Sequence, residues 1–86
     1  MMKVKKPSDK EIAEAKNWPV WVKGASNFPW YYDATEICYI VEGEVTVTDD
    51  SGRYIVCKAG DYVEFEKGLS CNWNITKAIK KHYTFL

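Results

Sequence analysis

From residue 20 onward, hydrophobic and polar positions alternate with a period of two, which is typical of β-strands that bury one face. Short segments rich in Val, Ile, Tyr, Trp and Thr follow this pattern at residues 20–23, 28–33, 36–42, 44–49, 53–58, 61–65, 70–75 and 80–85. Strands at such spacing predict an all-β sandwich or barrel. The turn sequence DDSG at residues 49–52 indicates that the segments on either side of it form a β-hairpin.

The N-terminal residues follow a different pattern. Residues 7–15 predict one short helix, because Ser8 and Glu11 have the spacing of a capping box. A chain of 86 residues has enough material for one hydrophobic core only. We therefore expect a single domain over residues 1–86, with an N-terminal arm and helix in 1–17 and a β-barrel in 18–86.

Composition excludes several classes of protein. Hydrophobic residues make up 47% of the chain and aromatic residues 15%, which is typical of a folded protein and not of a disordered one. Twelve basic and twelve acidic residues give a formal net charge of zero, so the chain has no overall field that attracts nucleic acid. No apolar run is long enough to span a bilayer or to form the core of a signal peptide. We expect a cytoplasmic protein that binds neither nucleic acid nor a membrane.

The three cysteines Cys38, Cys57 and Cys71 cannot all pair with one another, and none of them forms a CxxC motif. This pattern favours neither a disulfide framework nor a structural zinc site. We expect all three to be reduced thiols.

Two segments carry candidate chemistry on one face. Phe28, Trp30 and Tyr32 alternate onto the same side of their segment, which predicts a stiff aromatic wall. In the segment 36–42, Glu36 lies on the same side as Cys38, and burial of a carboxylate without a partner is costly. These residues therefore indicate a pocket. The alternative is that the aromatic residues simply pack in the core and that Glu36 is the remnant of a lost site.

Pro29 lacks a backbone N–H, and prolines in sheets lie at edges or bulges. It predicts that the aromatic segment forms an edge strand or carries a β-bulge.

The spacing of Glu36 and Gly43 is similar to the second half of the first cupin motif, G-x5-HxH-x3,4-E-x6-G. Gly60 and Gly68 have the interval of the second motif, G-x5-PxG-x2-H-x3-N, with Cys71 at the position of its histidine. The chain thus resembles the cupins, and most closely the short single-domain cupins related to ureidoglycine aminohydrolase. The resemblance implies a double-stranded β-helix, the cupin barrel.

In metal-binding cupins, two histidines and the glutamate of the first motif join the histidine of the second around a divalent ion. Trp30 and Tyr32 occupy the two first-motif histidine positions if three residues precede Glu36, and Pro29 and Tyr31 occupy them if four do. Only Glu36 remains of the four ligands. A divalent metal ion would then need Glu36, Cys71 and a further ligand, either Cys38 or His82, because stable sites use three or four ligands.

We therefore expect a cupin barrel whose pocket binds a small polar metabolite, polar-aromatic or carbohydrate-like, with no metal or a weakly held one. The predicted pocket residues are Trp30, Tyr32, Glu36, Cys38, Cys71, Trp73 and His82. One alternative is a divergent metal-dependent enzyme of the ureidoglycine aminohydrolase type, with the metal at Glu36, Cys71 and His82. A second is a structural or regulatory homodimer that associates through Trp18, Trp21 and the edge strand.

Overall fold

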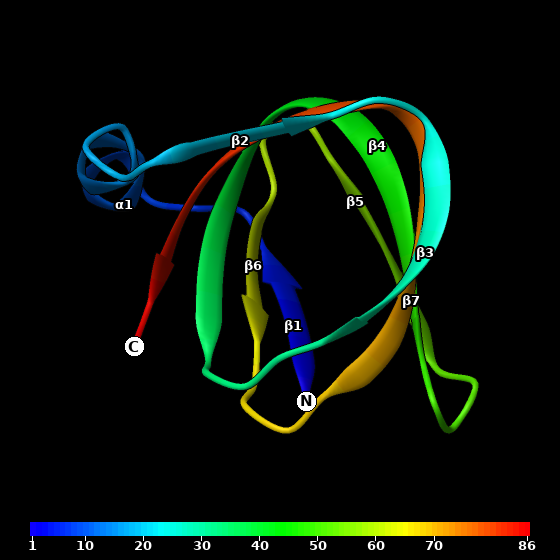
Figure 1. Cartoon of the computed structure of the whole chain (residues 1–86). Helices are drawn as coiled ribbons and strands as arrows, with labels where there is room; N and C mark the ends of the chain where they lie inside the picture. The colour runs from blue at the N-terminus through cyan, green and yellow to red at the C-terminus, as the bar shows by residue number, and fades with distance from the viewer.

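Two long curved strands organise the computed structural model of the protein, which describes residues 1–86 (Figure 1). The elements in chain order are β1 (Met2–Lys5), α1 (Asp9–Ala15), β2 (Val20–Lys23), β3 (Ser26–Tyr31), β4 (Glu36–Asp49), β5 (Tyr54–Lys58), β6 (Tyr62–Phe65) and β7 (Ser70–Phe85). All strand pairs are antiparallel. The prediction of an all-β barrel with a short N-terminal helix is confirmed.

The long strands β4 and β7 pair with each other and also with different strands along their length. The first half of β4 pairs with β6 and its second half with β5. The first half of β7 pairs with β3 and its second half with β2. Both strands bend, so the sheet curls over on itself and forms a barrel (Figure 1).

The continuity of β4 and β7 corrects the sequence prediction, which divided each of them into two strands. Pairing of β4 with β7 runs from Glu36 to Asp49 through register shifts between Ile40 and Val45. Gly43 lies in this irregular stretch with a φ of 95°. The predicted break between residues 36–42 and 44–49, at Gly43, is therefore wrong, because this glycine bends a strand that continues on both sides of it.

The chain termini add to the barrel. β1 was not predicted, and it pairs with β6 in a register from Met2 opposite Phe65 to Lys5 opposite Tyr62. Helix α1 lies outside the barrel (Figure 1). Its predicted capping box is present, because Ser8 Oγ accepts a hydrogen bond from the Glu11 N–H and Glu11 Oε1 accepts one from the Ser8 N–H. α1 has neither the length nor the apolar character to cross a membrane.

The interior of the barrel contains one core, formed by inward-facing side chains of the curved sheet. Its buried members are Tyr32, Cys38, Ile40, Val45, Val47, Cys57, Val63, Phe65, Leu69, Cys71, Trp73, Ile75 and Ile79. The ring of Phe65 stacks on that of Tyr32, with 4.8 Å between the ring centroids. Tyr32 and Trp73 belong to this core and also face the hollow that remains inside the barrel.

Candidate ligand-binding pocket

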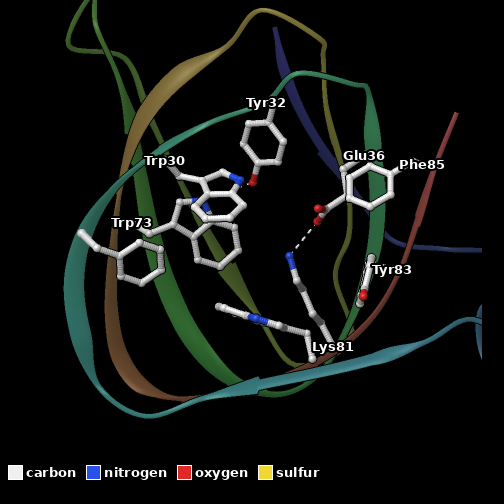
Figure 2. Close-up of a pocket in the computed structure, with 9 residues that line it drawn as sticks. Trp30, Tyr32, Glu36, Trp73, Lys81, Tyr83 and Phe85 are labelled. Atoms are coloured by element: carbon white, nitrogen blue, oxygen red, sulfur yellow. Dashed lines mark hydrogen bonds and ion pairs between the residues drawn. The ribbon is translucent and has the colours of Figure 1, made fainter.

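A cavity of about 200 Å³ opens into the barrel (Figure 2). Its walls come from β2, β3 and β7 and from the start of β4, so distant parts of the sequence meet around it. The lining residues are Trp21, Phe28, Trp30, Tyr32, Glu36, Trp73, Lys81, Tyr83 and Phe85. The walls are therefore mainly aromatic, with two charged side chains among them.

Strand β3 provides one aromatic wall. Phe28 and Trp30, together with Tyr32 just after the strand, line the cavity, as their alternation predicts. Trp30 lies at the mouth of the cavity and is 51% exposed. β3 pairs only with β7 and is an edge strand, which confirms the prediction from Pro29.

Glu36 and Lys81 form an ion pair inside the cavity. Lys81 Nζ donates a hydrogen bond to Glu36 Oε2 over 2.6 Å, and each side chain is only 7% exposed. The two residues lie on the neighbouring strands β4 and β7, and Lys81 has Ile40 as its backbone partner. Figure 2 shows the two charged groups meeting within the ring of aromatic side chains. The prediction that Glu36 points into the barrel is confirmed, and its partner is a lysine.

Three aromatic rings surround the Lys81 ammonium group. Its Nζ lies 4.7 Å from the ring centre of Trp73, 4.9 Å from that of Trp21 and 5.9 Å from that of Tyr83. The negative faces of aromatic rings attract a cation at such distances. Glu36 and these rings together compensate the ammonium group for the water that it loses on burial.

Tyr32 contributes a hydroxyl group to the cavity. Its oxygen accepts a hydrogen bond from Trp73 Nε1 at 3.2 Å. Burial, and secondarily the nearby Glu36 carboxylate, raises the pKa of the Tyr32 phenol far above its ordinary value. Tyr32 therefore stays protonated and remains a hydrogen-bond donor at neutral pH.

Four of the predicted pocket residues, Trp30, Tyr32, Glu36 and Trp73, lie together around the cavity. The other three do not line it, which corrects the prediction. Cys38 is completely buried in the core, and Cys71 Sγ donates a weak hydrogen bond to the Trp30 carbonyl at 3.5 Å. His82 Nδ1 lies 3.0 Å from the Trp18 carbonyl oxygen. His82 faces away from the cavity because Lys81 and Tyr83, its neighbours along β7, face into it.

The predicted metal ligands do not converge. No group of three or more His, Cys, Asp or Glu side chains anywhere in residues 1–86 could hold a metal ion, so Glu36, Cys71 and His82 form no site. In addition, Lys81 already places a positive charge against Glu36. The residues of this pocket do not fit the divalent ion of metal-binding cupins.

Sequence reasoning missed four pocket residues: Trp21, Lys81, Tyr83 and Phe85. Lysines are seldom buried, so a lysine in a Lys-rich segment is read as solvated. The alternation along β7 carried the signal, because Ile79 is buried in the core and every second residue after it faces inward.

The comparison with known families agrees with the barrel. Residues 11–83 match the EutQ-like cupin domain. The chain belongs to this cupin family. Acetate kinase EutQ of Escherichia coli K12 is 36% identical over 56 residues, which are 65% of this chain and 24% of that protein. The chain thus spans about a quarter of the length of this relative.

Solved structures show the same barrel. A DUF861 family protein from Thermotoga maritima is 42% identical, each chain covers 100% of the other, and the TM-score is 0.96. The EutQ protein of Clostridium difficile is 20% identical and resembles this chain in fold, with a TM-score of 0.70 over 77% of this chain and 52% of that one. None of these matches supports the closer relationship to ureidoglycine aminohydrolase.

Proposed function

We propose that the barrel binds a small metabolite with one ring and several polar groups, either polar-aromatic or carbohydrate-like. The observation that carries this proposal is the buried Glu36–Lys81 pair at an accessible aromatic cavity. Buried ion pairs contribute little net stability compared with apolar residues of similar size. Charged groups that remain in a pocket despite this cost are candidates for ligand recognition.

The size of the cavity supports a ligand with one ring. Pockets for drug-sized molecules have volumes of about 300–1,000 Å³, and this cavity has about 200 Å³. Its aromatic walls offer stacking surfaces for an aromatic ring or for the apolar face of a sugar ring.

The polar atoms of the pocket can both donate and accept hydrogen bonds. Glu36 uses Oε2 for Lys81, and no protein group donates a hydrogen bond to its Oε1. No fully buried side-chain oxygen lacks a partner, so Oε1 is accessible from the cavity. Lys81 Nζ has two further N–H groups, and Tyr32 has its hydroxyl proton. A ligand with hydroxyl, amide or amine groups suits this set of atoms.

The cavity gives no support to an activity like that of acetate kinase EutQ. The only cation in the cavity, Lys81, is paired with Glu36, and the remaining lining is mainly apolar. Phosphate groups generally bind where several unpaired cations or backbone N–H groups point at them. This lining therefore does not favour a nucleotide.

Thermal-shift measurements with pentoses, hexoses and single-ring aromatic alcohols and acids test the proposal. We expect at least one compound to raise the Tm, because a ligand that binds only the folded state stabilises it. Trp30→Ala should weaken this shift. Tyr31→Ala is the matched control, because Tyr31 has a similar exposure on the same strand, 59%, and is not among the lining residues. Absence of a shift across the panel, or equal loss in both variants, would contradict the proposal.

A further inference from the structure

We propose that Lys81 forms a Schiff base with small aldehydes that enter the pocket, and that Glu36 carries the proton for this reaction. The inference rests on the proposed function, because it requires that a small molecule enters the cavity. It adds a covalent step and a substrate class, a carbonyl compound of no more than about one ring.

Lys81 differs from the other lysines in its surroundings. It is the only lysine among the buried residues, and its side chain is 7% exposed, whereas that of its neighbour Lys80 is 45% exposed. Aromatic rings surround its amine, and the amine lies at the wall of a cavity. Lysines in desolvated apolar pockets are the ones that proteins use as amine nucleophiles.

Glu36 supplies the base that the reaction needs. An ammonium group has no lone pair, so Lys81 must lose a proton before it can attack a carbonyl carbon. Glu36 Oε2 accepts a hydrogen bond from Lys81 Nζ over 2.6 Å, and a proton can pass directly along it. Glu36 is then a carboxylic acid beside the reacting nitrogen, placed to return the proton in the later step.

The reaction balances without a cofactor. The neutral amine attacks the carbonyl carbon, the π-electron pair moves to the oxygen, and transfer of a proton from nitrogen to that oxygen gives a carbinolamine. Glu36 protonates its hydroxyl group, the nitrogen lone pair forms the C=N bond, and water leaves. The overall change converts the lysine ammonium ion and the aldehyde into an iminium ion and water. The product keeps its positive charge next to the Glu36 carboxylate.

The rest of the pocket suits this chemistry. The Tyr32 hydroxyl faces the same cavity, and because it stays protonated it can donate a hydrogen bond to the carbonyl oxygen (Figure 2). Such a bond stabilises the negative charge that develops on this oxygen during attack.

Reductive trapping tests the inference. The protein is incubated with benzaldehyde and sodium cyanoborohydride at neutral pH, and the modified lysines are located by peptide mass spectrometry. We expect Lys81 to be modified faster than the exposed Lys80. Labelling of Lys80 and the other exposed lysines with Lys81 unmodified would overturn the inference.

Three variants show whether the pocket causes the modification. Lys81→Arg keeps the charge next to Glu36 and should abolish the adduct at this position, whereas Lys80→Arg, the matched control, should leave the adduct at Lys81 unchanged. Glu36→Gln should slow labelling of Lys81 by roughly 100-fold or more, the usual effect of losing a general acid–base group. Equal rates in Glu36→Gln and the wild type, with both folded by thermal melting, would overturn the role of Glu36. If Lys81 is not labelled while a Trp30-dependent thermal shift remains, the inference fails and the proposed binding function stands.

Discussion

At the scale of single residues, Glu36 and Lys81 depend on each other, because burial of either charge alone would cost free energy of desolvation. Each charged group loses most of its water, and each regains a partner at 2.6 Å. The rings of Trp21 and Trp73 add further attraction for the ammonium group. Removal of one member of the pair therefore leaves the other charged and unpaired in an aromatic environment.

Because of this dependence, we expect Lys81→Met to lower the free energy of unfolding. Breaking a buried ion pair from one side costs about 3–5 kcal/mol of unfolding free energy. Urea denaturation at pH 7 measures the loss. The control is Lys80→Met, because Lys80 is exposed and lies 3.9 Å from Glu42, a distance at which surface pairs contribute about 0–1 kcal/mol.

The double variant Glu36→Gln/Lys81→Met separates the cost of an unpaired buried charge from the cost of lost side-chain contacts. It removes both charges and should recover part of the stability that Lys81→Met loses, because no unpaired charge remains. If the double variant loses as much unfolding free energy as Glu36→Gln and Lys81→Met lose together, the two charges act independently. That result would contradict the ion pair.

The buried thiols predict a loss of stability in alkali. Burial raises the pKa of Cys38 and of Cys57 to about 12 and that of Cys71 to about 11, from an ordinary value of 9.0. Above pH 9 the unfolded chain loses these protons while the folded chain keeps them. The unfolding free energy should therefore fall as pH rises from about 9 to about 12, and these thiols should have no effect on it below that range.

Denaturation at a series of alkaline pH values measures this slope. Cys38→Ala provides the control, because it removes one of the three thiols and should make the slope shallower. A slope that is unchanged in Cys38→Ala would show that other groups cause the loss of stability.

At the scale of elements, the bend of β4 depends on one backbone position. A side chain at Gly43 would place its Cβ 2.1 Å from the Ala78 carbonyl oxygen of β7, and the φ of 95° is unfavourable for other residues. Both strands must separate locally to admit any side chain here. The bend and the pairing with β7 therefore require glycine.

Substitutions of three glycines should give graded losses of stability. Gly43→Val should cost more than about 2 kcal/mol, because it adds overpacking to backbone strain. Gly60→Val should cost about 1–3 kcal/mol from strain alone, because its φ is 94° and its nearest neighbour is 3.8 Å away. Gly24→Val is the control, since that position has open space and no positive φ. Thermal and urea unfolding measure the order, and equal stability of the Gly43 and Gly24 variants would contradict the close approach to Ala78.

The elements also show how far strand alternation predicts a site. Alternation assigned Phe28, Trp30 and Tyr32 to one wall and placed Glu36 inside, and the structure confirms both. His82, the only histidine, was assigned to the pocket because the sequence prediction divided residues 70–85 into two strands, so the inward face of Cys71 and Trp73 was not continued into 80–85. Lys81 pairs with Ile40 of β4, next to the register shifts that lie between Ile40 and Val45. This pairing decides that Lys81 faces inward and His82 outward.

At the scale of the whole molecule, association into a homodimer stays a prediction. β2 and β3 each pair with a single strand and expose apolar side chains at the edges of the sheet, among them Val20 and Val22. Trp21, which we expected at the dimer seam, instead lines the cavity. The remaining predicted seam therefore consists of Trp18 and of exposed edge residues.

Light scattering after size-exclusion chromatography should give the mass of two chains at micromolar concentration. Val22→Lys should lower this mass toward that of one chain, because edge lysines oppose pairing between strands. Tyr54→Lys is the matched control, because Tyr54 is exposed on β5, which is another edge of the sheet. This variant should leave the mass unchanged. A single-chain mass for the wild-type protein would contradict the prediction.

The sequence by itself determined the all-β class, the capped helix, the β4–β5 hairpin, the aromatic wall and the inward position of Glu36. Each of these follows from residues that are close in the chain, through a period of two, a cap or a turn. Only the tertiary structure decided that β4 and β7 are continuous, that three predicted site residues lie away from the cavity and that Lys81 neutralises Glu36. Glu36 and Lys81 are 45 positions apart, and their meeting depends on the curvature and register of the sheet, which no local pattern encodes.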